Sequence, residues 1–348
     1  MDQSIVDINQ TSANPDLGGI PPYRDTVRIV PDSAGLEQAG ALLRKGGLVA
    51  FPTETVYGLG ADATQATAIA ALYAAKGRPQ FNPLISHVAT LDQARAEGIL
   101  NASALKLAER FWPGPLTLVV PRHPAGQVCD LACAGLASIG LRLPSHPIAR
   151  YLIEKAGRPI AAPSANRSGH ISPTTPDHVW DDLNTRIDAV LEGFASPVGV
   201  ESTIIACLDD SPVMLRHGGI TREMIADCLG YDISDSHQTA DTTKPLAPGM
   251  LDSHYAPNAK VRLGAKTVSA GEAVLLFGAD KPAGILEETI RLNLSPRGDL
   301  TEAAANLYAY LRRLDRHDIT GIAVMPIPDN DLGAAINDRL RRAAAPRP

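Results

Sequence analysis

Short apolar runs alternate with segments of helical periodicity through residues 26–230, and this alternation limits the possible fold more than any other feature of the sequence. An apolar run at 27–30 precedes a helical pattern with Leu36, Ala39, Leu42 and Leu43 on one side, and a Gly46-Gly47 break leads into a run at 48–51. Further strand-like runs lie at 84–88, 116–120, 139–143, 160–162, 189–191 and 203–206, and further helical patterns at 67–76 and 102–111. This mixture predicts an α/β domain whose sheet need not be purely parallel.

The chain changes character after residue 230. Residues 231–260 carry turn formers and three prolines with almost no aliphatic periodicity, which is typical of a linker. Apolar runs at 273–277 and 322–325, with helical patterns at 302–316 and 332–343, then predict a smaller Rossmann-like α/β domain, to which we assign no dinucleotide because GxGxxG is absent. We therefore expect a mobile leader at 1–24, a first domain at 25–230, a linker at 231–260 and a second domain at 261–348.

Composition excludes several classes of protein. Hydrophobic residues make up 45% of the 348 residues and charged residues 20%, which is ordinary globular usage rather than that of a disordered or fibrous chain. The formal net charge of −6 argues against a surface coated with basic residues for nucleic acid. No run of about 18 apolar residues and no signal peptide is found, so we expect no membrane association and a cytoplasmic location.

Four cysteines are too few and too scattered for a disulfide framework in a chain of this length. Cys129 and Cys133 could share a helix face and bind a metal, but no second close Cys or His pair completes a zinc site. We expect buried thiols and assign no metal to protein side chains.

The segment PTETVYGLG at 52–60 places hydroxyls and a carboxylate at the end of an apolar run. Pro52 cannot continue a central strand, and Gly58 and Gly60 permit tight backbone turns close to a ligand. The alternative is an ordinary turn with locally satisfied hydroxyls.

The segment KGRPQFNPL at 76–84 places two cations at the end of a predicted helix. Lys76 and Arg78 suit phosphate oxygens, although cations at a helix C-terminus also simply complement the helix dipole. The segment is not a P-loop, because the spacing GxxxxGK[ST] does not occur in the sequence.

Other strand ends repeat this theme. Hydroxyl, amide or guanidinium groups follow apolar runs at 138–144, at 161–169 with 172–174, at 201–203 and at 215–219. Ligands of open α/β sheets bind beside strand ends, so we expect these groups to form one site. No Ser-His-Asp arrangement, HExxH or GxSxG motif indicates a covalent or metalloprotease mechanism. A site rich in positive charge and hydroxyls instead suits a nucleoside triphosphate with Mg²⁺ and a small polar partner.

With these segments assembled, the chain resembles the YrdC-like family, in its long two-domain type of threonylcarbamoyl-AMP synthase. The matching segments are PTETVYGLG (52–60), KGRPQFNPL (76–84), FWPGPLTLVV (111–120), LRLPSHP (141–147), APSANRSGHISPT (162–174), ESTI (201–204), LRHGGI (215–220), PGMLDSHYAP (248–257) and AAINDRLRRAA (334–344). Three places depart from the family pattern: Ser86, His217 and the Leu251-Asp252-Ser253 stretch, which is less basic than expected of the linker. The resemblance implies a YrdC-like twisted mixed-sheet domain followed by a smaller Rossmann-like domain.

The activity that the resemblance implies joins L-threonine, bicarbonate or CO₂ and ATP into threonylcarbamoyl-AMP with release of pyrophosphate, for a tRNA modification completed by downstream transferase proteins. Direct contact with tRNA stays open. By the same resemblance the threonine site comprises Thr55, His87, Arg142, Ala162 and Ser202. The ATP site comprises Arg78, Asn82, Ser138, Ser164, Ser172, Arg216 and Tyr255, with Lys76, Arg78 and Arg216 as the catalytic cations. Tyr255 of the linker is expected to close over the nucleotide, and Mg²⁺ to arrive with ATP.

Two other functions remain open at this point. A carbamoyl-adenylate-forming enzyme could serve another acceptor, although the accompanying acylphosphatase and zinc-finger modules of such proteins are missing from the sequence. An RNA-binding or ribosome-assembly factor could use the same basic cavity without catalysis, but aromatic residues are only 4% of the chain, which disfavours base stacking.

Overall fold

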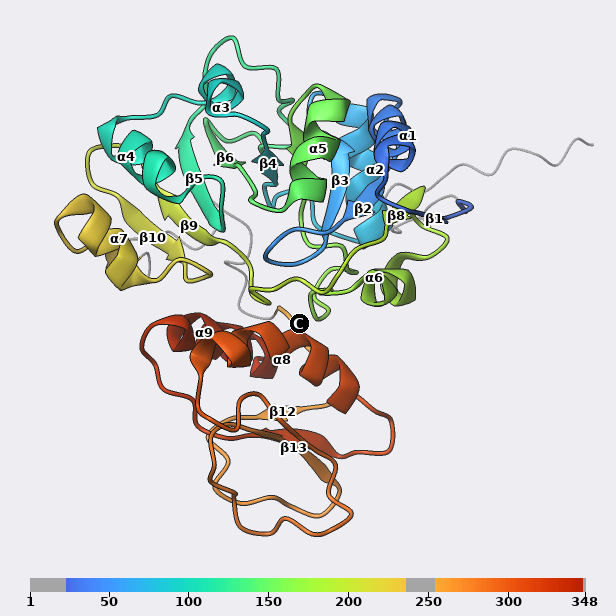
Figure 1. Cartoon of the computed structure of the whole chain (residues 1–348), viewed down its shortest axis with the longest axis vertical. Coiled ribbons are helices and arrows are strands. Elements are labelled where there is room, and N and C mark those ends of the chain that lie inside the picture. Colours follow the sequence, from blue (N-terminus) through green and yellow to red (C-terminus); the bar gives the residue numbers. More distant parts are fainter. Residues whose placement is uncertain (1–22, 236–253, 347–348) are drawn as a thin grey trace, which may run out of the picture.

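A computed structural model describes residues 23–235 and 254–346 as two α/β units built on separate sheets (Figure 1). Most of the expected leader, most of the expected linker and the Leu251-Asp252-Ser253 stretch lie outside the described residues. Arg24, at the end of the expected leader, already contacts the larger unit through an ion pair with Asp188. The expected domain limits stay predictions.

The larger unit contains an eleven-stranded sheet and seven helices in its described residues. The strands are β1 (Val27–Ile29), β2 (Val49–Phe51), β3 (Gly58–Asp62), β4 (Ile85–His87), β5 (Leu116–Pro121), β6 (Ser138–Arg142), β7 (Ile160–Ala161), β8 (Ala189–Leu191), β9 (Thr203–Ala206), β10 (Val213–Arg216) and β11 (Ser234–Asp235). The helices are α1 (Ser33–Arg44), α2 (Ala66–Lys76), α3 (Leu91–Glu97), α4 (Ala102–Phe111), α5 (Pro147–Ala156), α6 (Pro176–Leu183) and α7 (Arg222–Leu229).

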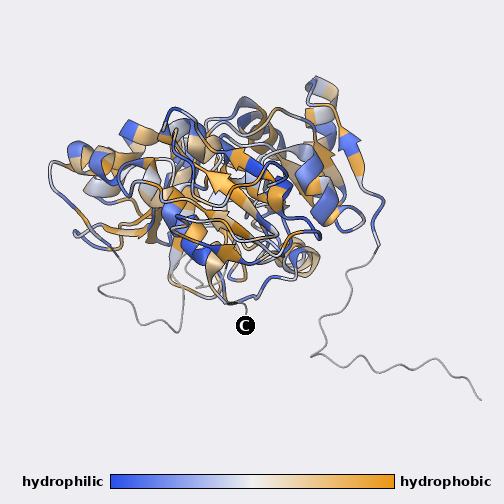
Figure 2. Cartoon of the chain, turned by 90° about the horizontal axis from the view of Figure 1, so that it is seen from below, coloured by the Kyte–Doolittle hydropathy of each residue, from blue (hydrophilic) through white to orange (hydrophobic). Residues whose placement is uncertain are grey.

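The strand order of the larger sheet is β1-β8-β2-β3-β7-β4-β6-β5-β9-β10-β11. Its pairing is mixed, since β4 runs parallel to β6 whereas β5 runs antiparallel to β6. The predicted mixed-sheet α/β fold is therefore confirmed. Hydrophobic residues concentrate on the strands and on one side of several helices (Figure 2), as amphipathic elements around a shared core require.

One local prediction is wrong: Gly58 and Gly60 do not form turns but belong to β3, which pairs antiparallel with β2. A Cβ atom at residue 60 would lie 2.9 Å from the ring of Phe51 and 3.0 Å from the carbonyl oxygen of Val49. Glycine is used here because a neighbouring strand and its aromatic side chain approach the backbone closely.

The two faces of the larger sheet are covered differently. The main core lies between one face and helices α2, α4, α6 and α7. Helices α1 and α5 cover the other face over β1, β2, β7 and β8. Over β4, β5, β9 and β10 that second face carries a small apolar cluster of Ile85, Val119, Ile204, Ala206 and Leu215. This face is the part of the sheet on which the candidate site is built.

The smaller unit contains a parallel four-stranded sheet of order β12-β15-β13-β14. Its elements are β12 (Val261–Arg262), β13 (Glu272–Leu276), β14 (Arg291–Asn293), α8 (Leu300–Leu314), β15 (Gly321–Val324) and α9 (Leu332–Ala344). Helices α8 and α9 lie on the side of this sheet that faces the larger unit (Figure 1). This arrangement confirms the predicted second, smaller α/β domain.

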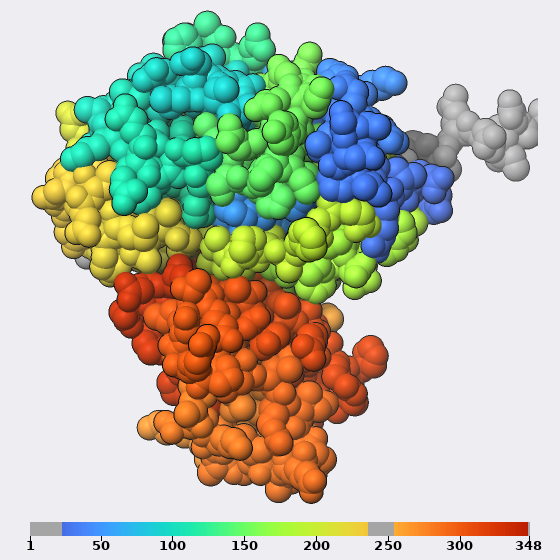
Figure 3. Space-filling model, viewed as in Figure 1, coloured from blue at the N-terminus to red at the C-terminus, as the bar shows by residue number. Residues whose placement is uncertain are grey.

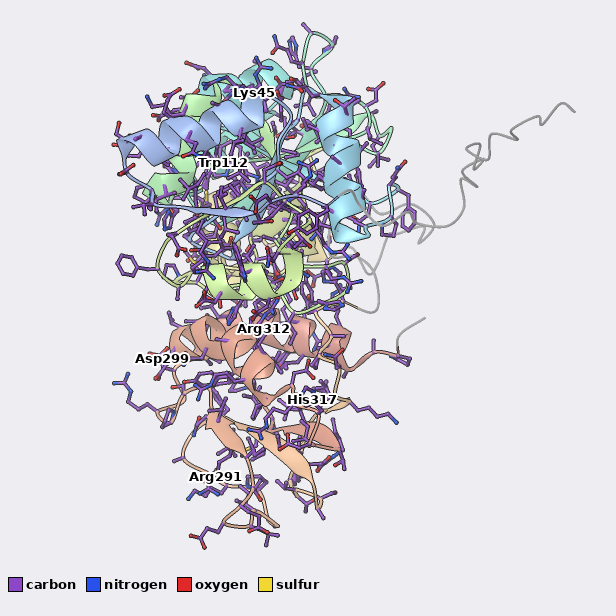
Figure 4. All side chains as sticks on the ribbon, turned by 90° about the vertical axis from the view of Figure 1, so that its right-hand side faces the viewer. Lys45, Trp112, Arg291, Asp299, Arg312 and His317 are labelled. Atoms are coloured by element: carbon purple, nitrogen blue, oxygen red, sulfur yellow. The ribbon has the colours of Figure 1, made fainter. Side chains whose placement is uncertain are left out.

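The two units meet along α8 and α9, and the space-filling view shows them in contact there (Figure 3). Val56, Ile171 and Val200 of the larger unit share one buried cluster with Leu307 and Tyr308 of α8. Arg312 of α8, labelled at this junction in Figure 4, pairs with Asp182 of α6 at 2.8 Å. The junction therefore combines apolar burial with a specific ion pair.

Candidate active site

One cavity lies on the second face of the larger sheet, beside the junction. Nine of the predicted site residues line it: Thr55, Arg78, His87, Arg142, Ala162, Ser164, Ser202, Arg216 and Tyr255. The other lining residues are Val56, Ile85, Pro163, Glu201 and His254. The convergence of distant strand ends on one cationic cavity is thus observed.

Strand periodicity explains how the cavity gains its side chains. Successive side chains of a strand point to opposite faces, so Ser138, Gly140 and Arg142 of β6 share the face of the cavity. Ile139 and Leu141 between them belong to the main core on the other face. The parallel register of β4 and β6 then sets His87 beside Arg142.

Thr55 lies in a compact turn after β2. Thr53 Oγ lies 2.8 Å from Thr55 Oγ and donates to the carbonyl oxygen of Val56 at 2.6 Å. The turn is thus closed by its own hydroxyls, as the simpler interpretation of this segment expected, and it still presents Thr55 to the cavity.

Arg142 is held by a carboxylate that the sequence analysis did not assign to the site. Its Nη2 donates to Glu54 Oε1 at 2.6 Å, and both side chains are less than a tenth exposed. The second Glu54 oxygen accepts from the backbone N–H of Ser145 at 3.2 Å. Arg142 Nε is buried and bonds to no other described residue, which leaves a donor for a ligand. Glu54 belongs to the PTETVYGLG segment, which was expected to reach a site with several arginines. A carboxylate in that segment was the sequence signal that could have predicted its ion pair with an arginine.

His87 is a neutral group in this cavity. Burial and the positive charge of Arg142 lower its pKa to about 3. Its Nδ1 lies 3.3 Å from the carbonyl oxygen of Ile85. A neutral imidazole can hydrogen-bond a hydroxyl or amine of a ligand without adding charge.

Arg78 and Arg216 supply the cationic wall. Burial lowers the pKa of Arg78 to about 10, so the guanidinium remains charged at neutral pH. Its Nη2 donates to the carbonyl oxygen of Pro83 at 3.2 Å. Arg216 donates from Nε to the carbonyl oxygen of Ser202 at 3.0 Å and from Nη2 to Ser202 Oγ at 3.1 Å. Burial also lowers the pKa of Arg216.

Four predicted site residues are not among those that line the cavity: Lys76, Asn82, Ser138 and Ser172. Lys76 Nζ donates to the carbonyl oxygens of Ser164 and Asn166, and burial together with the charge of Arg78 lowers its pKa well below the usual value. Lys76 therefore braces the loop that carries Ser164. Asn82 is buried beside Arg78, and Ser138 lies at the opposite end of β6 from Arg142.

Glu201 joins the cavity to the second domain. It accepts hydrogen bonds from Ser172 Oγ at 2.6 Å, Tyr308 OH at 2.7 Å and Arg339 Nε at 2.7 Å. Burial raises the pKa of a carboxyl group, but the charges of Arg339 and Arg216 and the hydrogen bonds from Ser172 and Arg339 outweigh it and lower the pKa of Glu201 to about 2. Glu201 is therefore ionised at neutral pH.

His254 and Tyr255 extend the cavity wall from the far side. Both are buried, their ring centroids are 4.1 Å apart, and Tyr255 has a left-handed backbone with φ of 62°. Burial, with the nearby charge of Arg78, lowers the pKa of His254 to about 3, so this ring is neutral. The sequence analysis assigned Tyr255 to the site but not His254.

Metal ligands do not gather in residues 23–235 and 254–346, where no group of three His, Cys, Asp or Glu side chains is placed to hold an ion. The cysteines are free thiols, with Cys133 and Cys207 buried. Cys129 and Cys133 lie in a turn region rather than on a helix.

Two family models match the chain in sequence. Residues 41–218 match the Sua5, YciO and YrdC model described as telomere recombination, and residues 220–345 match the model described as threonylcarbamoyl-AMP synthase, C-terminal domain. The chain belongs to the Sua5/YrdC family. The predicted family is therefore confirmed, in its two-domain form.

Individual Sua5/YrdC proteins are similar over nearly the whole chain. The threonylcarbamoyl-AMP synthase of Bacillus subtilis is 41% identical over 90% of this chain and 93% of its own length. That of Pyrococcus abyssi is 40% identical over 89% of this chain and 94% of its own length. A crystal structure of P. abyssi Sua5 complexed with L-threonine superposes with a TM-score of 0.82 at 36% identity, over 92% of this chain and 97% of that one. The chain is an enzyme of this family, and none of the helices in its described part is long and apolar enough to cross a membrane.

Proposed function

We propose that this enzyme forms L-threonylcarbamoyl-AMP from L-threonine, bicarbonate or CO₂ and ATP, with release of pyrophosphate. The single observation that carries the proposal is the meeting of Arg78, Arg142 and Arg216 in one cavity with the hydroxyls of Thr55 and Ser202. The threonine complex of P. abyssi Sua5 and the names of the relatives support threonine and ATP as substrates. They favour this activity over an RNA-binding factor or a carbamoyl-adenylate former for another acceptor.

We assign the threonine end of the cavity to the residues around Arg142. The guanidinium, already oriented by Glu54, binds the substrate carboxylate through its remaining donors. Neutral His87, Thr55 and the backbone of Ala162 contact the amino acid on the same side. These contacts fix the substrate amine so that its carbamate forms next to the nucleotide.

We assign the nucleotide end to Arg78, Arg216, Ser164 and Tyr255. The carbamate oxygen attacks the α-phosphorus of ATP and pyrophosphate leaves, while the two guanidinium groups stabilise the charge that develops on the phosphate oxygens. Asn82, Ser138 and Ser172 are assigned to ATP by the family pattern, and Lys76 acts by holding the Ser164 loop. No enzyme nucleophile is needed, because orientation and charge neutralisation supply the catalysis.

Mg²⁺ is proposed to enter with ATP. The cavity fits an ion held by the triphosphate rather than by protein, because its acidic lining residue Glu201 is engaged by Arg339, Tyr308 and Ser172. When bound, Mg²⁺ neutralises phosphate charge and fixes the conformation of the triphosphate.

The wider role proposed here is a step in tRNA modification in the cytoplasm. A threonylcarbamoyl-adenylate is an activated mixed anhydride, so a transferase must consume it by passing the threonylcarbamoyl group to tRNA adenosine. We assign the first domain to catalysis, the 231–260 linker to closure over the nucleotide, and the second domain to support of that closure.

The proposed reaction is tested by incubating the full chain with ATP, Mg²⁺ and bicarbonate, with either threonine or serine, and measuring pyrophosphate. We expect release that depends on threonine and is much slower with serine. Release without an amino acid, or no release with threonine, contradicts the proposal.

A further inference from the structure

Arg339 is an arginine in a core position of α9. The buried residues of this helix include Ala335, Ile336, Arg339 and Leu340, and Arg339 is completely buried among them. A buried charge is costly unless it is paired and hydrogen-bonded. The contacts of Arg339 therefore indicate why a charged side chain occupies this position.

The guanidinium of Arg339 uses all three nitrogens. Nε donates to Glu201 Oε2 at 2.7 Å, Nη1 to Asp338 Oδ2 at 2.6 Å and Nη2 to the carbonyl oxygen of His217 at 2.9 Å. Its Cζ also lies 5.2 Å from the centroid of the Tyr255 ring, within the range of a cation–π contact. Three of these four partners belong to the first domain or to the linker end.

Two of the partners flank proposed substrate-binding residues. Glu201 precedes Ser202, and His217 follows Arg216, which itself donates twice to Ser202. The two segments touch through their backbones, since a Cβ at residue 218 would lie 2.3 Å from the carbonyl oxygen of Glu201. Arg339 thus binds both segments, although it is not itself among the residues that line the cavity.

We propose that Arg339 is a positioning residue, through which the second domain fixes Arg216 and Ser202 for binding the nucleotide. The proposal rests on the proposed ATP-dependent function. It assigns the second domain a part in the geometry of the active site beyond holding the linker. The planar fork of arginine is required, because a lysine ammonium cannot reach Glu201, Asp338 and the His217 carbonyl together.

The test compares Arg339→Lys and Arg339→Gln with the matched controls Arg341→Lys and Arg341→Gln. Arg341 stands on the same helix with an exposed side chain, and its ion pair with Asp329 is long, at 4.0 Å.

ATP affinity of the full chain is measured by calorimetry with Mg²⁺, and KM values for ATP and threonine by pyrophosphate release. We expect Arg339→Gln to weaken ATP binding about tenfold, the effect of losing one charge-assisted hydrogen bond, and to raise the KM for threonine by a smaller factor. Arg339→Lys should lie between this variant and wild type, and the Arg341 variants should match wild type.

A double-mutant cycle separates positioning from general loss of stability. Glu201→Gln and Arg339→Gln act on one hydrogen-bonded unit, so the double variant should bind ATP about as weakly as either single variant. If the Arg339 variants do not fold, Tyr308→Phe removes the other donor to Glu201 Oε2 and should still raise the KM for ATP. The proposal is overturned if folded Arg339 variants bind ATP as tightly as wild type, or if the effects of the two substitutions on ATP affinity multiply in the double variant. If the Arg339 variants do not fold, an unchanged KM for ATP in Tyr308→Phe overturns it. A wild-type chain that binds no ATP contradicts the proposed function instead.

Discussion

Replacing Glu201 by glutamine should make the stability of this protein less dependent on pH. Glu201 is buried and accepts hydrogen bonds from Ser172, Tyr308 and Arg339. These partners and nearby charges favour the carboxylate over the neutral acid, and they lower its pKa from 4.5 to about 2. Glutamine keeps the size of the side chain but cannot ionise.

The pKa of Glu201 sets the expected magnitude. A fall from 4.5 to about 2 corresponds to about 3 kcal/mol of folding free energy at neutral pH. Because the folded-state pKa lies below the unfolded value, this stabilisation is complete above about pH 4.5 and is lost as the pH falls toward 2. We therefore expect Glu201→Gln to be about 3 kcal/mol less stable than wild type at pH 7, and this difference to shrink by about 1 kcal/mol at pH 3.5.

The free energy of unfolding can be measured by urea titration with circular dichroism at pH 7, 5, 4 and 3.5. Glu109→Gln is a matched control, because Glu109 is an exposed residue of α4 and the same substitution there should leave stability within about 0.5 kcal/mol of wild type. A difference between wild type and Glu201→Gln that stays constant from pH 7 to 3.5 would show that the ionised Glu201 carboxylate does not stabilise the fold.

Three further substitutions test the site. Arg216→Ala should weaken ATP binding more than threonine binding in calorimetry, and equal ATP affinities before and after would rule out its proposed role. Arg142→Lys, which removes the planar guanidinium that bonds to Glu54 and keeps Nε for a ligand, should raise the KM for threonine about tenfold or more while the KM for ATP changes less; the reverse order contradicts the assignment. Gly218→Ala would place a Cβ 2.3 Å from two backbone atoms, so urea unfolding should show a loss of about 1–3 kcal/mol, and wild-type stability would show that the close approach is absent.

Apolar runs bounded by polar turns allowed most of the fold to be predicted. The runs at 189–191 and 203–206 coincide with β8 and β9, because buried central strands are apolar on both faces. Strand β3 was missed, since the glycines that let β2 approach it resemble turn residues in the sequence. Strands β11 and β12 are two residues long each, and they contain too few apolar residues to be predicted from hydrophobic patterning.

The candidate site was predictable where polar groups end apolar strands, and the structure gathers nine of those residues in one cavity. Side-chain direction was not predictable. Lys76 and Arg78 are two residues apart, yet Lys76 binds carbonyl oxygens whereas Arg78 lines the cavity. Arg339 was missed although it stands four residues after Ala335 and three after Ile336, on the apolar side of its helix. An arginine on the apolar side of a helix indicates a buried ion pair, but only the tertiary structure shows that its partner is Glu201.

In the proposed reaction one cavity brings a nucleotide and a small amino acid together. Mass spectrometry of a reaction with ATP, threonine and ¹³C-bicarbonate tests it most directly. We expect an AMP conjugate that contains threonine and one labelled carbon, formed together with pyrophosphate. ATP consumption without such a conjugate, or a conjugate that lacks the labelled carbon, would show that the proposed reaction does not occur.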